Sequence, residues 1–101
     1  MEYNDDYDDG EFVWNLEKAK LNPEKHEGVT FFDAKTIWDR PTRSRPDRRH
    51  YNEDRFITVG FMPSGVLLVV ARSYVDDKIR IISARKATPK EAREFHGRNR
   101  D

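Results

Sequence analysis

The amino-acid sequence predicts a single domain of the α+β class, in which a run of strands is flanked by helices. Three consecutive segments between residues 56 and 86 are rich in β-forming residues and are separated by turn signals. On either side, stretches with helical spacing of apolar residues follow good N-cap residues. A chain of 101 residues suits one domain with a modest core. We therefore expect any functional site to lie on the surface or in a shallow cleft.

The first predicted elements are a short strand and a helix. Residues 12–14 are aromatic or β-branched, which favours a strand. Asn15 is a good N-cap for a helix that we expect to run through Leu21. Pro23 limits or kinks this helix, because proline lacks the N–H that a helix interior requires. Gly28 then ends the region.

A second helix is predicted to begin at Thr30, because Asp33 stands at the spacing of a capping box. Its apolar face is formed by residues at helical intervals, namely Phe31, Ala34, Ile37 and Trp38. Residues 40–54 then form a connection with room for a short edge strand. This connection contains five arginines within ten residues, which are Arg40, Arg43, Arg45, Arg48 and Arg49.

The centre of the sheet is predicted to be an antiparallel meander of three strands, at residues 56–62, 66–74 and 78–86. The first two strands are joined by Pro63-Ser64-Gly65, which is a hairpin signal, and the last two by residues 75–77. Apolar residues occupy both alternating sets of positions in the middle strand. We therefore expect that strand to be central and covered on both faces.

The final helix has a clear beginning in the sequence. Thr88 is a natural N-cap, Pro89 suits the first helical position, and Glu91 completes a capping box. We expect the helix to run to about Phe95 and to end at Gly97. Residues 98–101 are predicted to fray.

The formal net charge of zero hides a strong segregation of charge. Six of the 19 acidic residues lie in residues 1–11, which hold no base, so the other ninety residues carry 19 Lys and Arg against 13 Asp and Glu. We expect residues 1–11 to be disordered, as a solubilising or vector-derived tail, with the folded domain at residues 12–97. The alternative is a tail that folds over the basic face as a mimic of a polyanion. A basic body favours polyanions, although ordinary protein surfaces also carry many lysines and arginines.

Several classes of protein are disfavoured by what the sequence lacks. There is no cysteine, so disulfides, thiolate zinc sites and cysteine nucleophiles are absent. The longest apolar run, residues 66–71, is too short to cross a bilayer, and the acidic N-terminus is no secretory signal. No HxxxH spacing occurs and the carboxylates form no ligand cluster outside the tail. We expect a cytoplasmic protein with no metal, no cofactor and no contact with a membrane.

The residues with most chemical potential are arginines and histidines. An arginine side chain holds phosphate oxygens at two points, and RNA cleavage by its own 2′-hydroxyl needs positioning, charge stabilisation and proton transfer. A sheet bearing Arg72, Arg80 and Arg85 that faces a loop with Lys25, His26 and Arg55 could supply such a clamp. His26 and His50 could share acid and base work. The alternative is that the arginines form surface salt bridges with Asp76, Asp77, Glu91 or Glu94.

The segment from Arg80 to Arg85, Arg-Ile-Ile-Ser-Ala-Arg, followed by Lys86-Ala87-Thr88, resembles the RIISAR-x-AT signature of the BrnT toxins. Other segments resemble the same family in the same order. They are Val13-Trp14-Asn15 with Lys18, Asn22 and Lys25-His26; Gly28-Val29-Thr30-Phe31 with Ala34; Asp47 with Arg55; and Gly60 with residues 67–70. The resemblance therefore covers residues 12–95.

This resemblance implies a RelE/ParE-like fold and a metal-independent endoribonuclease that arrests translation. It also implies a BrnA-like antitoxin with a ribbon–helix–helix part, a 2:2 complex of toxin and antitoxin, and operator DNA bound only through the antitoxin. In the mechanism that we expect, Arg80 and Arg85 hold phosphate and Arg55 stabilises developing charge. Lys25 or His26 then handles protons.

The sequence departs from the family pattern at several positions. Glu27 is an additional residue, and the others are Arg72, Val75, Ala92, Phe95 and His96. The C-terminal helix could therefore contribute less to catalysis here. The alternative function is a non-catalytic module that binds RNA or the antitoxin. DNA binding by this chain alone is a third hypothesis, for which no convincing recognition helix is present.

Overall fold

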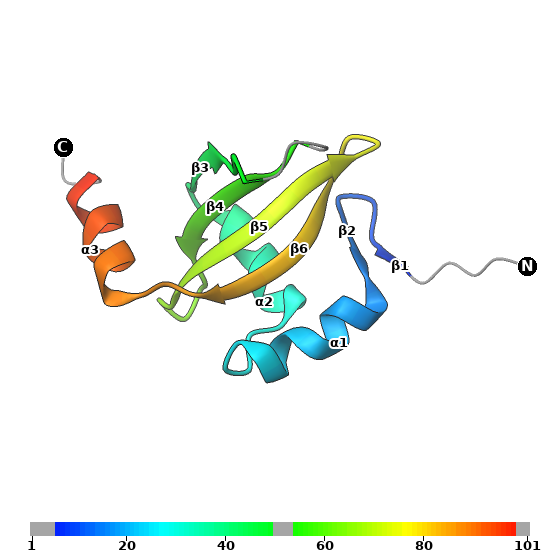
Figure 1. Cartoon of the computed structure of the whole chain (residues 1–101), viewed down its shortest axis with the longest axis horizontal. Coiled ribbons are helices and arrows are strands. Elements are labelled where there is room, and N and C mark those ends of the chain that lie inside the picture. Colours follow the sequence, from blue (N-terminus) through cyan, green and yellow to red (C-terminus); the bar gives the residue numbers. More distant parts are fainter. Residues whose placement is uncertain (1–5, 50–53, 99–101) are drawn as a thin grey trace, which may run out of the picture.

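The computed structural model describes residues 6–49 and 54–98, which form one six-stranded sheet with helices around it (Figure 1). The strands are β1 (Asp6–Asp8), β2 (Phe12–Asn15), β3 (Arg43–Pro46), β4 (Phe56–Phe61), β5 (Leu67–Val75) and β6 (Lys78–Lys86). The helices are α1 (Leu16–Lys25), α2 (Phe31–Lys35), the 3-10 helix η1 (Thr36–Asp39) and α3 (Pro89–Arg98). Across the sheet the order is β1-β2-β6-β5-β4-β3.

The predicted α+β class and the antiparallel meander are confirmed, because β4, β5 and β6 are paired antiparallel in that order. Residues 67–70 of β5 are all buried, as expected for a central strand covered on both faces. The sheet is mixed, however, since β2 runs parallel to β6 through Phe12↔Ile79 and Val13↔Arg80. The open possibility of an edge strand in the arginine-rich connection is realised as β3.

The helix caps confirm the local signals of the sequence. Asn15 accepts a hydrogen bond from the Lys18 N–H, and Thr30 and Asp33 form a reciprocal capping box. The single helix predicted from Thr30 is divided into α2 and η1. The C-terminal helix passes the expected ends at Phe95 and Gly97 and continues to Arg98, so the predicted fraying of residues 98–101 is wrong for Arg98. Residues 99–101 lie outside the described residues.

The prediction that residues 1–11 are disordered is wrong for residues 6–11. Residues 6–8 form β1 and pair antiparallel with β2, while residues 1–5 lie outside the described part of the chain. Two physical reasons explain the order. Tyr7 stacks on Trp14 with ring centroids 4.1 Å apart, and the neighbouring aspartates meet basic side chains. The dense like charge, which predicted disorder, is compensated by cations far along the sequence.

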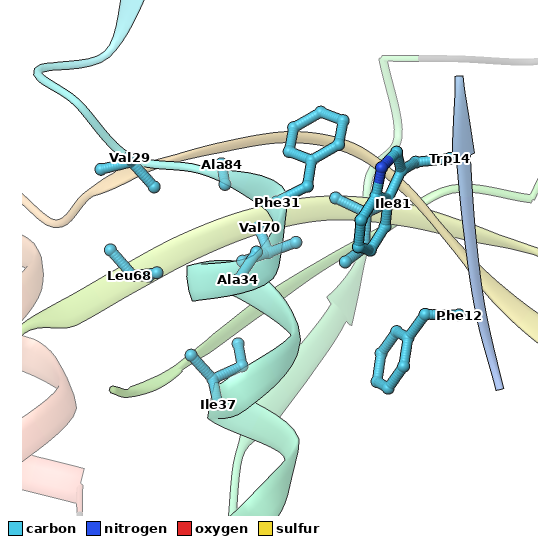
Figure 2. Packing of buried hydrophobic residues seen from close by; sticks show 10 residues of the cluster. All are labelled: Phe12, Trp14, Val29, Phe31, Ala34, Ile37, Leu68, Val70, Ile81 and Ala84. Atoms are coloured by element: carbon cyan, nitrogen blue, oxygen red, sulfur yellow. The ribbon is translucent and has the colours of Figure 1, made fainter. Parts of the chain in front are cut away.

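The core lies between one face of the sheet and the helices α2 and η1, which cover that face (Figure 2). Phe31, Ala34 and Ile37 pack there against strand residues, which are Leu68, Val70, Ile81 and Ala84. Figure 2 shows Trp14 and Phe12 of β2 entering the same cluster from the side. The opposite face of the sheet, which we call the open face, is covered in part by α3, where Phe95 packs edge-on against Phe61. Elsewhere this face carries polar side chains of β6, such as Ser83 and Arg85.

A β-bulge in β6 decides which side chains reach the open face. Ala71 pairs with Ser83 but Arg72 pairs with Ile81, so Ile82 is an additional residue in β6. Side chains alternate along a regular strand, so residues five apart would point to opposite faces. The bulge restores the phase, since Ile81 and Ala84 both enter the core. Arg80 and Arg85 consequently share the open face.

The side chain of Asn22 connects α1 to the part of β6 that lies beyond its pairing with β2. Asn22 is buried, and its Nδ2 donates to the carbonyl oxygens of Val29 and Ala84, each at 2.8 Å. Its Oδ1 accepts from the N–H of Ala84 at 3.3 Å. Three otherwise unpaired buried backbone groups are therefore satisfied by one amide.

We predict that Asn22→Ala lowers the free energy of unfolding by about 3 kcal/mol, because it leaves buried backbone groups without partners. Asn15→Ala is the matched control, since it removes an exposed N-cap bond and costs about 1 kcal/mol. Urea unfolding monitored by circular dichroism measures both values. Equal losses in the two variants would contradict the role assigned to Asn22.

Candidate functional site

The open face contains a groove between the end of α1, β3 and the middle of the sheet. Its lining residues are His26, Arg45, Pro46, Asp47, Arg48, Arg49, Ile57, Val69, Ala71, Ser83 and Arg85. We call it the basic groove, because four of these side chains are arginines and one is an acid. The floor is apolar strand surface, which favours a ligand with both charged and flat apolar parts.

Asp47 organises the arginine-rich side of the basic groove. Its side chain is 3% exposed and accepts two hydrogen bonds from Arg49, at 2.9 and 3.0 Å. The backbone N–H of Asp47 also donates to the carbonyl oxygen of Arg55 at 2.8 Å, which ties the start of the loop to its end. Hydrogen bonding to Asp47 raises the pKa of Arg49. Arg49 compensates the charge of Asp47, so the other three arginines give the lining a net positive charge.

Arg85 lies in the basic groove with its guanidinium already oriented. It makes two parallel hydrogen bonds to Glu91, at 2.8 and 2.9 Å, and its side chain is 42% exposed. These bonds lower the pKa of Glu91 to about 2 and raise the pKa of Arg85. The expected alternative of a salt bridge is therefore confirmed for Arg85 and Glu91. The exposed remainder of the guanidinium faces a groove of like charge.

His26 is brought to the basic groove by the end of α1. It is the C-cap residue of this helix, and its backbone N–H donates to the Asn22 carbonyl oxygen at 2.9 Å. Asn22 in turn holds Ala84, the neighbour of Arg85. The same asparagine therefore places an imidazole and a guanidinium beside one groove. Lys25 is exposed at the end of α1 and does not line the groove.

Arg80 occupies the other end of the open face. Its Nη2 donates to Asp6 at 3.1 Å, and its side chain is 29% exposed. It borders a smaller cleft whose other lining residues are Asp54, Phe56, Ser73, Tyr74 and Val75. Arg55 is half-buried and lines neither hollow. His50, the other expected histidine, lies outside the described residues.

The expectation that Arg72 joins Arg80 and Arg85 in a clamp is wrong. Arg72 is buried at 6% exposure, where its Nε donates to Thr58 at 2.8 Å and its Nη2 to Ser44 at 3.1 Å. Its guanidinium carbon lies 4.8 Å from the ring centre of Phe56 and 4.9 Å from that of Tyr74. Arg72 points away from the open face because it alternates in phase with Leu68 and Val70, the core residues of the same strand. Hydroxyls and aromatic rings hold its charge inside the protein.

The sequence did not assign Arg45 of β3, or Arg48 and Arg49 of the following loop, to the site. The sequence signal for these residues is the run of five arginines in ten residues, which lies in a segment predicted to be a connection between elements. Their convergence depends on β3, which pairs Arg45 with Ile57 and thereby directs the following loop along the open face. Ser83 is identified in the sequence only as part of the Arg80–Arg85 motif. In the structure it lies on β6 and lines the groove.

Residues 6–49 and 54–98 contain neither a cluster of metal ligands nor a helix that could span a membrane. In these ranges no three histidine, aspartate or glutamate side chains converge in a way that could hold a metal ion. None of the helices there combines the length and the apolar character that a bilayer crossing demands.

Comparison with known proteins places the chain in a family. Residues 14–91 match the model of the family described as the ribonuclease toxin BrnT of type II toxin–antitoxin systems. The crystal structure of the Brucella abortus ribonuclease toxin BrnT is similar in fold, with a TM-score of 0.58 and 20% sequence identity. The similarity covers 74% of this chain and 92% of that one. The comparison with curated proteins gives no significant match.

We predict that the Glu91 carboxylate makes stability depend on pH. Because its pKa falls from 4.5 to about 2 on folding, its contribution is complete above pH 4.5 and is lost as the pH falls towards 2. Glu91→Gln should remove this part of the dependence, while the amide retains the capping box with Thr88. Urea unfolding at pH 7, 5, 4 and 3 measures the difference. A constant gap between wild type and variant would contradict the assignment.

Proposed function

This chain belongs to the BrnT family of ribonuclease toxins, and from that premise we propose that it is an endoribonuclease whose open face binds the ribose–phosphate chain. The observation that carries the proposal is the placement of Arg80 and Arg85 on one face by the bulge in β6. The four arginines of the basic groove extend the same face towards β3. A single strand could follow this surface with its phosphates on the guanidinium groups.

The proposed chemistry is attack of a 2′-hydroxyl on the adjacent phosphorus. The new bond joins the 2′-oxygen to phosphorus, the bond to the 5′-oxygen breaks, and the products are a 2′,3′-cyclic phosphate and a 5′-hydroxyl. Arg85 holds oxygens of the reacting phosphate and stabilises the charge that develops on them, while Arg80 holds another phosphate further along the strand. His26 moves protons at the reacting oxygens, because its imidazole lines the groove. Lys25 and Arg55 act as auxiliary groups at the margin, and no metal takes part.

The proposed cellular role is arrest of translation in the cytoplasm by RNA cleavage. A type II toxin has an antitoxin partner, and we propose a BrnA-like protein with a ribbon–helix–helix part. Its dimer would bring two toxins together in a 2:2 complex, and the complex would contact operator DNA through the antitoxin. We further propose that the fold is related to that of the RelE and ParE toxins.

We predict that Arg80→Ala abolishes growth arrest in cells while the protein remains folded and bound to the antitoxin. The matched control is Arg93→Ala, which removes the same charge from an exposed position of α3. Growth after induction and co-purification with the antitoxin measure the two properties. Retained toxicity would remove Arg80 from the mechanism.

We also predict that the purified toxin cleaves labelled RNA in the presence of a chelator. A 2′-O-methyl RNA cannot be cut, so its binding can be measured alone. The logarithm of its affinity should fall by about 0.7 per neutralised phosphate for each tenfold rise in salt concentration. Arg45→Ala should lower that slope by about one phosphate. Salt-sensitive binding with no cleavage at any protein concentration would favour the non-catalytic module instead.

A further inference from the structure

The residues before the family match carry an ordered acidic segment. We call residues 6–9 the acidic strap, and they precede the matched range of residues 14–91. Three carboxylates of this strap are ion-paired. Asp6 pairs with Arg80 at 3.1 Å, Asp8 with Lys78 at 2.6 Å, and Asp9 with Lys35. The strap therefore neutralises cations from two elements, β6 and α2.

The position of the acidic strap is fixed by apolar packing and backbone pairing as well as by charge. Tyr7 stacks on Trp14 at 4.1 Å and meets Phe32 edge-on at 5.2 Å. Strand alternation then directs Asp6 and Asp8 to the side opposite Tyr7, which is the open face. Asp9 closes the turn by accepting hydrogen bonds from the N–H groups of Glu11 and Phe12. The two carboxylates are thus delivered to the end of the open face where Arg80 lies.

The arrangement places a carboxylate where an RNA phosphate would bind. A guanidinium uses the same directed N–H groups for a carboxylate and for a phosphate, so Asp6 and a phosphate compete for Arg80. The pair is partly exposed, with side chains 32% and 29% accessible, and exposed pairs contribute little to stability. A polyanion can consequently displace Asp6 without unfolding the domain.

We propose that Asp6 is an intramolecular competitor of substrate phosphate at Arg80, with Asp8 acting likewise at Lys78. The inference rests on the proposed function, because it assigns regulation to the same RNA-binding face. With the strap in place, RNA enters at the basic groove beside Arg85. Binding of RNA to Arg80 requires displacement of the Asp6 carboxylate, so the strap lowers the affinity for the substrate.

The test compares Asp6→Asn with Glu17→Gln, which removes one acid from an exposed site in the first turn of α1. Affinity for single-stranded 2′-O-methyl RNA is measured at low salt. Asp6→Asn should bind about twofold to fivefold more tightly than Glu17→Gln, as expected for loss of an exposed competing pair. In an Arg80→Ala background this gain should vanish.

Tyr7→Ala is a second variant that leaves the net charge unchanged. It removes the stacking on Trp14 and should also raise the affinity, because the strap is then no longer held at Arg80. Equal affinities of Asp6→Asn and Glu17→Gln, or a gain that persists without Arg80, would overturn the inference while RNA cleavage by wild type upheld the proposed function. Absence of RNA binding in every variant would overturn both.

Discussion

The amide of Asn22 is the contact on which the geometry of the open face depends. Parallel pairing with β2 reaches β6 at Ile79 and Arg80, so the later part of that edge needs other partners. Asn22 supplies them, since it binds both backbone groups of Ala84 and also the carbonyl oxygen of Val29. One buried side chain therefore fixes the end of α1, the loop before α2 and the motif strand. His26 and Arg85, which both line the groove, lie next to these anchored groups in the sequence.

Local chemistry accounts for the part of the fold that the sequence predicts correctly. The caps at Asn15, Thr30 and Thr88 are short-range hydrogen bonds, and the meander follows from alternation and turn residues. The parallel pairing of β2 with β6 joins residues more than sixty positions apart, and no local pattern encodes it. The order of residues 6–8 fails to be predicted for the same reason, because its stabilising cations are distant in sequence.

The candidate site was predictable in part. The motif identified Arg80 and Arg85, but a regular strand would place them on opposite faces. The additional residue Ile82 changes that phase in β6. Arg72 enters the core side because it lies on β5, in phase with Leu68 and Val70. A bulge depends on how two strands fit together over their whole length, so the sequence of one strand does not reveal it. Assignment of the loop arginines likewise required the pairing of β3 with β4.

The carboxylate of Glu91 belongs to two structures at once. It accepts from the Thr88 N–H at the beginning of α3 and from both terminal nitrogens of Arg85. Helix initiation and the aim of the guanidinium are therefore thermodynamically linked. A binding partner that unwound the first turn of α3 would also release Arg85 from its fixed direction, and one that stabilised this turn would lock it. Control of the groove can thus be exerted from a helix that contributes none of the lining residues given above.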